Sequence, residues 1–428
     1  MARLVGGRHH GAIDVAAGEV VERAVRLATE LGVPLFALID SSGADVTDGV
    51  AALHAWGRCA RALADASGVV PVVVGVTGAA VSGPALMLGL ADHVLLTPDA
   101  FAYLSGPDQV AAFTGEAVDH RGLGGAAIHD RSTGLAAQVV PSEEIALAAH
   151  AILSYLPSHH LDDPPYELPD DPLDRPADVA AATVPTAANL AYDVRTVIDD
   201  ITDRDSFLEL YAGHAPNLVV GYGRLGGHAV GVVANQPAHR AGTLDLDASR
   251  KGARFVQMCD AFNVPLVTFV DTPGYEPGRD LEWRGIIRYG AQLVHAYCSA
   301  TVPRLGVVLR KAYGGAYIVM DSRGIGNDFC VAWPGAEIAV MGAPGAVQIL
   351  HGRELRSIDE LGARASRAGE LQAEYEAAYL SPRAAAERGY VDAVVRPAET
   401  RAALGHALAT LVTKREPSTA RRHSNPPL

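Results

Sequence analysis

One stretch of this chain recurs later in a similar form. Residues 33–43 read VPLFALIDSSG, and residues 264–274 read VPLVTFVDTPG. Two further pairs of segments follow in the same order and at nearly the same offset. In the first pair, Val70-Pro71 followed by Ser82-Gly83 matches Val302-Pro303 followed by Gly314-Gly315. In the second pair, residues 98–100 match residues 334–336. A repeat that keeps its order over this length predicts two copies of one fold in a single chain.

The length of the chain agrees with this division. A chain of 428 residues exceeds the size that one hydrophobic core serves, and 49% hydrophobic residues allow a core in each half. Residues 1–156 are predicted to form a first domain and residues 188–415 a second. Residues 157–187 are rich in Pro and Asp, which predicts a linker. Residues 416–428 are predicted to be a disordered tail.

Charge and cysteine content exclude several classes of protein. A net charge of −14 without a long basic run argues against nucleic-acid binding, which depends on Lys and Arg neutralising phosphates. The four cysteines are too far apart for a CxxC pair, so neither a zinc ribbon nor another metal site is expected. Scattered cysteines, no apolar leader and no membrane-length apolar stretch predict a cytoplasmic protein with no membrane partner.

The hydrophobic pattern predicts alternating helices and strands. Ranges 15–31 and 50–66 have helical spacing, and the short apolar runs between them are typical of strands buried on both faces. This alternation predicts an α/β fold with right-handed crossovers. The predicted strands are 35–39, 70–76, 94–96, 219–222, 229–234, 266–270 and 304–309. The predicted turn is 78–83, and the other predicted helices are 84–90, 192–201, 250–262, 285–298 and 355–379.

In each half a predicted strand leads into a turn of small residues and then into a helix. Backbone N–H groups at a helix start have no intrahelical partner, and the helix dipole adds partial positive charge. Such a turn can stabilise an oxyanion on a thioester or urea carbonyl, and small residues let the ligand approach closely. Alternatively, the glycines only let a helix pack tightly on a strand. Their repetition at one place in both copies favours the functional interpretation.

Side-chain catalytic motifs do not stand out. The sequence has no G-x-S-x-G nucleophile elbow and no H-E-x-x-H zinc motif. Chemistry that relies on backbone N–H groups leaves few catalytic side chains, which agrees with this pattern.

Several motifs of the second half occur together in one known family. They are GTLD at 242–245, KGARFV at 251–256, CDAFNVP at 259–265, FVDTPG at 269–274, GIIR at 285–288, RKAYGGAY at 310–317, AWP at 332–334 and AEIAVMG at 336–342. With these motifs the chain resembles the carboxyltransferase (β) subunit of biotin-dependent acyl-CoA carboxylases, of the propionyl-CoA carboxylase β type. The resemblance covers nearly the whole chain and is most specific from about residue 192 to residue 350.

The resemblance implies a fold, an activity and partners. The fold is two tandem crotonase-like (ββα-superhelix) domains, in a homo-oligomer that is usually a hexamer of paired subunits. The first domain binds an acyl thioester, on CoA or on a carrier protein, and the second binds carboxybiotin from a separate carrier subunit. A biotin carboxylase subunit is a further partner. The activity is transfer of a carboxyl group from carboxybiotin to the α-carbon of the acyl thioester, with two oxyanion holes.

The resemblance also implies roles for particular residues. Gly315 and Ala316 supply N–H groups to the ureido oxygen of biotin, and Ser82 and Gly83 supply them to the thioester enolate. Substrate-binding residues by position are Gly314, Tyr317, Ile318, Gly43 and Ala44. Ile318 falls where family members differ in the lining of the acyl pocket; alternatively, it packs in the core.

The first half departs from the family pattern. Ser82 stands where the family usually has glycine, and Pro84, which has no N–H, follows. Asp45 stands where an arginine is usual and would repel a phosphate. In the second half, Arg284 stands where a glycine is common. Because most departures lie on the thioester side, we expect an intact biotin side and an altered acyl partner.

Two other functions use the same scaffold. One is a decarboxylase of a malonyl-type thioester or β-keto acid, which would hold the same enolate after CO2 leaves. The other is a non-catalytic partner subunit that keeps the fold and the interface. The sequence alone leaves both open.

Overall fold

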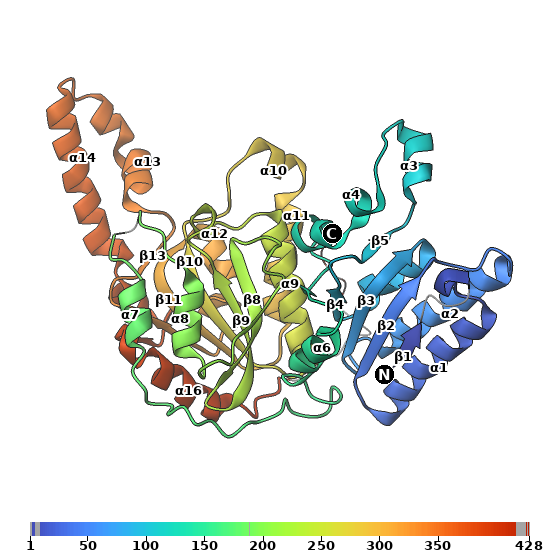
Figure 1. Ribbon diagram of the computed structural model, residues 1–428. Coiled ribbons are helices and arrows are strands. Elements are labelled where there is room, and N and C mark those ends of the chain that lie inside the picture. The colour runs from blue at the N-terminus through green and yellow to red at the C-terminus, as the bar shows by residue number, and fades with distance from the viewer. Residues whose placement is uncertain (1, 5–8, 188, 417–424, 426, 428) are drawn as a thin grey trace. The chain divides into compact units, whose positions relative to one another are not determined.

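The computed structural model describes the chain except for residues 1, 5–8, 188, 417–424, 426 and 428, so most of the predicted tail lies outside the described residues (Figure 1). The chain divides into two compact units. The first comprises the residues up to Tyr166 with 208–215 and 261–264, and the second comprises 167–207, 216–260 and the residues from Pro265 on. The predicted linker 157–187 is shared between the two units, and the predicted domain limits stay a prediction.

The first unit contains a parallel sheet of six described strands. Its order is β1-β2-β3-β4-β6, and β5 pairs with β3. The strands are β1 (Ala2–Leu4), β2 (Leu35–Ser41), β3 (Val72–Val81), β4 (His93–Leu96), β5 (Phe101–Tyr103) and β6 (Gln138–Val139). The main helices are α1 (Val15–Leu31), α2 (Val50–Ala66), α3 (Pro107–Thr114), α4 (His120–Gly124), α5 (Ala126–Ile128) and α6 (Ile145–Leu153).

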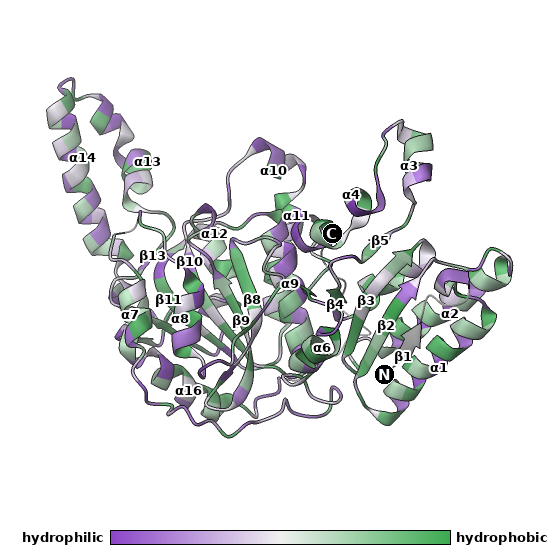
Figure 2. Ribbon diagram, in the orientation of Figure 1, coloured by the Kyte–Doolittle hydropathy of each residue, from purple (hydrophilic) through white to green (hydrophobic). Residues whose placement is uncertain are grey.

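The second unit contains a larger sheet of eight described strands. Its order is β14-β12-β11-β10-β9-β8-β7, and β13 pairs with β11. The strands are β7 (Leu208–Leu210), β8 (Leu218–Leu225), β9 (His228–Asn235), β10 (Leu266–Thr272), β11 (Arg304–Tyr313), β12 (Phe329–Ala332), β13 (Glu337–Ala339) and β14 (Ala393–Val394). The β8–β9 pair is antiparallel, whereas β9, β10, β11 and β12 run parallel. The central strands are predominantly apolar, as Figure 2 shows, because both faces of the sheet are covered.

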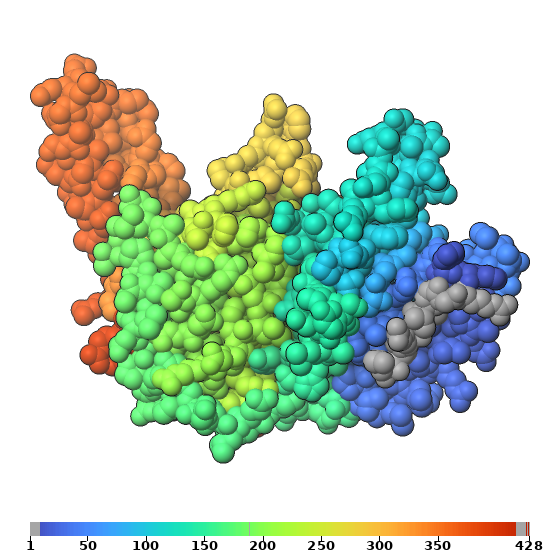
Figure 3. Space-filling model, viewed as in Figure 1, coloured from blue at the N-terminus to red at the C-terminus, as the bar shows by residue number. Residues whose placement is uncertain are grey.

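Helices cover both faces of this larger sheet or extend from it. They are α7 (Asp178–Thr183), α8 (Val194–Ile201), α9 (Leu246–Ala261), α10 (Arg279–Trp283), α11 (Ile286–Ser299), α12 (Gly314–Val319), α13 (Ala343–Arg356), α14 (Leu361–Tyr375), α15 (Pro382–Glu387) and α16 (Thr400–Leu411). In this second unit α13 and α14 form a projection with a small core of its own around Val347, Leu355 and Leu371 (Figure 3). No helix in the described part of the chain is both long and apolar enough to cross a membrane.

Most predicted elements are confirmed, and the α/β architecture with them. The helix predicted at 15–31 is α1, whose start is capped by Asp14 (the N–H of Ala17 donates to its Oδ1 at 2.7 Å) and whose end is Gly32 with φ of 63°. Two predictions are wrong. Residues 78–81 continue β3 rather than forming a turn, and the stretch 355–379 is interrupted between α13 and α14.

The repeated aspartate lies at the same irregularity in both sheets. The register between β2 and β3 passes from Ile39–Val76 to Ser41–Ala80, so β3 carries two extra residues, and the β10–β11 pair has the same bulge. In each case the aspartate accepts a backbone N–H from within the bulge. The N–H of Ala79 lies 3.0 Å from Asp40 Oδ1, and that of Lys311 lies 3.1 Å from Asp271 Oδ1.

The bulge lets one strand pair with two neighbours in succession. β3 pairs with β4 before the bulge and with β5 after it, and β11 pairs likewise with β12 and then with β13. Each bulged strand therefore pairs with one neighbour at its start and with another neighbour at its end. At that end lie the two small-residue turns singled out by the sequence.

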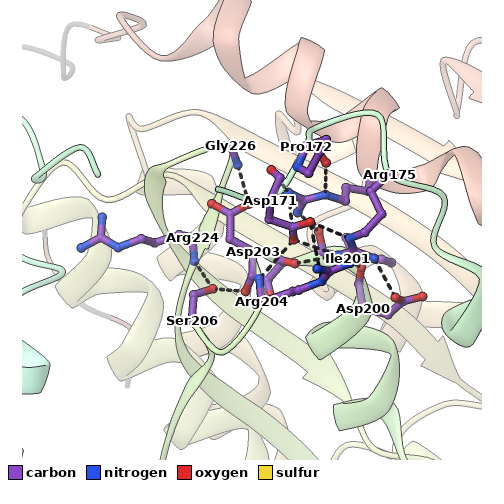
Figure 4. A network of polar contacts seen from close by, with 12 residues as sticks. Asp171, Pro172, Arg175, Asp200, Ile201, Asp203, Arg204, Ser206, Arg224 and Gly226 are labelled. Atoms are coloured by element: carbon purple, nitrogen blue, oxygen red, sulfur yellow. Dashed lines mark hydrogen bonds and ion pairs between the residues drawn. The ribbon is translucent and has the colours of Figure 1, made fainter. Parts of the chain in front are cut away.

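A buried network of charges holds parts of the second unit together. Figure 4 shows Asp171 between Arg175 and Arg204, and Arg175 Nε donates to Asp171 Oδ1 at 2.7 Å. Arg401, which is fully buried, donates to Asp203 Oδ1 at 2.7 Å and lies 3.3 Å from Asp171 Oδ2. Burial opposes ionisation of Asp171, but the hydrogen bond from Arg175 and the charge of Arg401 hold its pKa below the ordinary value. The network joins α16 to the segments before α7 and after α8.

We predict that Arg401→Met strongly destabilises the second unit. The substitution leaves the charges of Asp171 and Asp203 buried with fewer partners, and a loss of about 3–5 kcal/mol is expected in urea unfolding followed by circular dichroism. The control is Arg204→Met, because the Arg204 side chain is 68% exposed and lies 3.8 Å from Asp171. Its loss should stay below about 1 kcal/mol. Equal losses for the two variants would contradict the role of the network.

Candidate functional site

The glycine turn of the second unit joins β11 to α12. Gly314 has φ of 59°, in the left-handed region that favours glycine, and a Cβ there would lie 3.2 Å from the carbonyl oxygen of Val340. Gly315 and Ala316 follow at the start of α12, where backbone N–H groups have no intrahelical acceptor. The turn therefore presents two successive N–H groups from small residues.

The space beside Gly315 is open. Gly315 is exposed, and apart from its chain neighbours and its own helix backbone no described heavy atom lies within 4 Å of the position that a Cβ would take. Ala316, in contrast, is fully buried and fixes the start of α12 in the core. A ligand can thus approach the backbone of Gly315 while the next residue holds the helix in place.

Buried polar groups hold the end of β11, the strand that leads into this turn. Asp271 is fully buried, and its carboxylate accepts from the hydroxyl of Tyr192 at 2.9 Å and from Arg310 Nε at 3.1 Å, besides the N–H of Lys311. Burial raises the pKa of Asp271, although the charges of Arg310 and Lys311 oppose this shift. Arg310 also donates to the carbonyl oxygens of Ala187 and Leu190. The end of β11 is therefore anchored on both sides.

Three side chains around the turn differ in exposure. The hydroxyl of Tyr313 donates to Glu337, and burial together with this hydrogen bond raises the pKa of Tyr313. Tyr317 is buried, and this burial raises its pKa. Ile318 is 42% exposed. Its predicted role in an acyl pocket stays a prediction, but the alternative that Ile318 packs in the core of this chain is wrong.

The turn of the first unit occupies the matching place after β3. Ser82, Gly83 and Pro84 correspond to Gly314, Gly315 and Ala316 at the offset of the repeat. Ser82 has φ of 65° and ψ of −155°, a conformation that is essentially restricted to glycine. Its N–H donates to the carbonyl oxygen of Tyr103 at 2.9 Å. The predicted use of this N–H for an oxyanion therefore needs correction, because it continues the pairing of β3 with β5.

Gly83 is the remaining N–H donor of this turn, since Pro84 has none. Gly83 also lies directly against Trp56 of α2. A Cβ on Gly83 would lie 2.8 Å from Cζ2 of Trp56, and the indole Nε1 of Trp56 is buried without an acceptor among the described residues. Trp56 thus fills the space that is open beside Gly315 in the other copy. The two turns share a backbone path but differ in free donors and in free space.

The loop after β2 packs against the same turn. Gly43 has φ of 110°, and a Cβ there would lie 3.0 Å from the carbonyl oxygen of Val81 and 3.1 Å from Cβ of Ser82. Ala44 is half-buried and forms a bridge to Ile13. Gly43 and Ala44 therefore lie near the Ser82 turn within the first unit, and their role in binding substrate stays a prediction.

Asp45 fixes this loop and carries a negative charge. Its carboxylate lies 2.6 Å from Nδ1 of His9 and accepts from both the N–H and the hydroxyl of Thr47. The hydrogen bonds from His9 and Thr47 lower the pKa of Asp45 to about 2, so the group is ionised at neutral pH. A phosphate near Ala44 would be repelled by the negative charge of Asp45.

Sequence reasoning missed the aromatic residues beside the first turn. The hydroxyl of Tyr103 lies 2.7 Å from Nδ1 of His120, and both rings stack on Phe101. Burial raises the pKa of Tyr103, and the charge of Asp108 adds to this shift. No local pattern marks Trp56 or Tyr103, because their contacts with the turn join strands and helices that are distant in sequence.

The comparisons with known proteins identify the family. The carboxyl transferase domain model matches residues 8–426. The chain belongs to the carboxyl transferase family. The propionyl-CoA carboxylase carboxyltransferase subunit of Haloferax mediterranei is 43% identical over 98% of this chain and 81% of its own length. The methylmalonyl-CoA carboxyltransferase 12S subunit of Propionibacterium freudenreichii subsp. shermanii is 41% identical over 92% of this chain and 75% of its own length.

A solved carboxyltransferase structure has the same fold. The transcarboxylase 12S structure, described as a hexamer with methylmalonyl-coenzyme A and methylmalonic acid bound, superposes with a TM-score of 0.94. It is 38% identical and is matched over 98% of this chain and 80% of that one. The predicted relationship to carboxyltransferase β subunits and the predicted fold of two crotonase-like domains are confirmed. Within the described residues, no group of His, Cys, Asp and Glu is arranged to hold a metal ion.

We predict that Ser82→Gly stabilises this carboxyltransferase-family chain. Glycine relieves a backbone strain of about 1–3 kcal/mol but adds unfolded-state entropy of about 0.5–1 kcal/mol, so a net gain near 1 kcal/mol is expected in urea unfolding. Ser67→Gly is the matched control, because Ser67 has φ of −58° and carries no such strain. It should lower the unfolding midpoint. A lower midpoint for Ser82→Gly as well would show that Ser82 is unstrained.

Proposed function

We propose that this chain moves a carboxyl group between carboxybiotin, carried on a separate subunit, and the α-carbon of an acyl thioester. The observation that carries this proposal is the open turn at Gly315 and Ala316. The exposed Gly315 and the buried Ala316 place two successive N–H groups at the start of α12, and the space at the Cβ position of Gly315 is open. Chemistry of this kind needs donors aimed at an oxygen that gains negative charge.

The residues of the second turn fit a biotin ureido group. The ring is planar and must lie close to the donors, and the missing Cβ of Gly315 leaves room for it. The N–H groups of Gly315 and Ala316 would hold the ureido oxygen, and the left-handed Gly314 directs the chain toward them. Carboxybiotin on its carrier would supply the carboxyl group, and biotin would take up the proton that leaves the α-carbon. Asp271 and Arg310 keep the end of β11 fixed, so the donors need little reorganisation.

The first turn would hold the thioester oxygen with fewer backbone donors. The N–H of Gly83 remains available by position, whereas that of Ser82 is bonded to Tyr103. The exposed hydroxyl of Ser82 is the nearest side-chain replacement within the turn itself. The anionic Asp45 disfavours a phosphate beside the Gly43–Ala44 loop. These features support an acyl thioester substrate that differs from ordinary propionyl-CoA and is presented on CoA or on a carrier protein.

Relatives support transfer over decarboxylation. Several relatives that are 41–43% identical are named as carboxylase or carboxyltransferase subunits, whereas the α subunit of methylmalonyl-CoA decarboxylase from Veillonella parvula is 37% identical. We propose that a biotin carboxylase and a biotin carrier subunit work with this chain. We also propose that several copies assemble, as the hexamer described for the transcarboxylase 12S structure suggests. A reducing compartment such as the cytoplasm fits the four free cysteines.

We predict that Gly315→Val removes carboxyl transfer without unfolding the chain. The new side chain enters open space, so stability should change little, but it displaces the ligand from the N–H donors. A loss of about 100-fold or more is expected, which is the cost of removing one oxyanion donor. The measurement is transfer of labelled carboxyl from a carboxylated biotin carrier to a panel of CoA- and carrier-bound acyl thioesters.

The matched control is Gly369→Val. Gly369 is exposed on α14 and also has no heavy atom within 4 Å of its Cβ position, so transfer should stay near the unmodified rate. Full activity of Gly315→Val would contradict the role of the turn. Consumption of a malonyl-type thioester without any biotin carrier would show that the chain is a decarboxylase.

A further inference from the structure

The strand that joins the end of each bulged strand carries different residues in the two copies. In the second unit β13 brings Glu337 and Ala339 beside Tyr313, and the hydroxyl of Tyr313 donates to Glu337. In the first unit β5 has Phe101 and Tyr103 at the matching places. Two aromatic rings in one copy therefore stand where the other copy has a carboxylate and a methyl group.

Tyr103 lies directly beside the turn of the first unit. It is the Cα partner of Val81, and its carbonyl oxygen accepts the N–H of Ser82 at 2.9 Å. The preceding pair of residues, Ala80 and Ala102, is buried in the core. Because successive side chains of a strand point to opposite faces, the side chain of Tyr103 lies on the other, half-buried face.

Helix α4 holds a histidine against this ring. A Cβ on Gly124 would collide with the carbonyl oxygen of Ala102, so the end of α4 lies in direct contact with β5. The start of α4 is capped by Asp119, whose Oδ1 accepts a backbone N–H of the first turn at 2.6 Å. Between these two fixed ends, Nδ1 of His120 lies 2.7 Å from the hydroxyl of Tyr103.

Three rings form one stack around this hydrogen bond. The ring centroid of Phe101 lies 4.9 Å from that of His120 and 5.6 Å from that of Tyr103, and the rings of Tyr103 and His120 are 5.8 Å apart. The interplanar angles are 28° or less. The stack and the hydrogen bond together fix the imidazole. His120 is nevertheless exposed, and its Nε2 has no hydrogen-bond partner among the described residues.

The hydrogen bond also decides which ring nitrogen carries the proton. Burial, assisted by the charge of Asp108, raises the pKa of Tyr103, so the phenol keeps its proton and donates it to Nδ1 of a neutral His120. Nε2 then carries the ring proton and is a hydrogen-bond donor. The carboxylates of Asp108 and Asp119 lie nearby in the chain and disfavour an anion at this place. The group that Nε2 can bind is therefore a neutral oxygen.

We propose that His120, oriented by Tyr103, donates from Nε2 to the acyl group and selects acyl thioesters that carry a hydroxyl or keto oxygen beyond the α-carbon. The inference rests on the proposed function, in which the thioester oxygen lies at Gly83. The selected oxygen lies beyond the α-carbon because that carbon receives the carboxyl group. His120 is then a binding residue for the substrate, and Tyr103 is a positioning residue.

The first test needs no turnover. The full-length chain is labelled with ¹⁵N at histidine, the signals of His120 are assigned by their loss in His120→Phe, and spectra are recorded at about pH 8, where imidazoles are mostly neutral. We expect the Nε2–H form of His120, and a mixture of both forms in Tyr103→Phe, which keeps the ring but removes the hydroxyl.

Thioesters of pantetheine, the part that CoA and carrier proteins share, are then added. We expect the Nε2 signal to shift with the 3-hydroxybutyryl, 3-ketobutyryl or 4-ketopentanoyl thioester and to stay in place with the butyryl and pentanoyl thioesters. Equal shifts with both groups, no shift with any of them, or the Nδ1–H form of His120 would overturn the proposal.

The second test measures selectivity in carboxyl transfer. The unmodified chain should prefer an oxygen-bearing thioester over the plain one of equal length by about 5- to 10-fold in kcat/KM, as one hydrogen bond contributes. His120→Phe keeps an aromatic ring in the stack and should abolish this preference. His150→Phe, at an exposed position of α6, is the matched control and should keep it.

The two tests separate this inference from the proposed function. An unchanged preference in His120→Phe would overturn the role of His120 while leaving carboxyl transfer in place. A selective response of Nε2 without transfer to any thioester would support the role of His120 and contradict only the carboxyl transfer.

Discussion

One carboxylate in each half, half-buried at Asp40 and fully buried at Asp271, makes the rest of this structure possible. Asp40 and Asp271 accept the N–H groups of Ala79 and Lys311 within a bulge of the neighbouring strand. Without this acceptor, the N–H of the buried Lys311 would be unpaired, at a cost of about 1–3 kcal/mol, and the N–H of the half-buried Ala79 would lose its partner within the bulge. With it, one strand leaves its first neighbour, joins a second one and ends at a turn. The position of both small-residue turns therefore depends on the repeated aspartate.

The two copies share this frame but differ in how they use it. In the second unit Asp271 is tied to Arg310 and Tyr192, and the turn above it presents Gly315 with open space. In the first unit the turn is occupied: Ser82 bonds to Tyr103, and Trp56 lies against Gly83. Duplication thus supplied two similar turns. One keeps the small residues that admit a ligand to the backbone, and the other has filled much of that space.

The parts of the fold that depend on local signals were predictable. Helix α1 is capped by Asp14 at its start and by Gly32 at its end, and the apolar periodicity between them indicates its length. Residues 78–81 were assigned to a turn because Gly78 and its small neighbours look like one, but Asp40 of another strand keeps them in β3. The long helix predicted at 355–379 breaks between Arg356 and Leu361, where charged residues give no local stop signal.

The candidate site was predictable only in part for the same reason. Residue types at Gly314–Ala316 and Ser82–Pro84 pointed to the turns, and the family motifs gave them roles. The bond from Ser82 to Tyr103 and the contact of Gly83 with Trp56 join elements far apart in the sequence. Such contacts carry no periodicity or spacing that a single sequence reveals, yet they decide which donors are free.

The most direct measurement is amide NMR of the chain labelled with ¹⁵N at glycine, alanine and serine, during titration with biotin and then with an acyl thioester. We predict that biotin shifts the amide resonances of Gly315 and Ala316. The thioester should shift that of Gly83 and leave that of Ser82 unchanged, because the Ser82 N–H stays bonded to Tyr103. A shift of Ser82 equal to that of Gly83, or no response of Gly315 and Ala316 to biotin, would contradict the unequal use of the two turns.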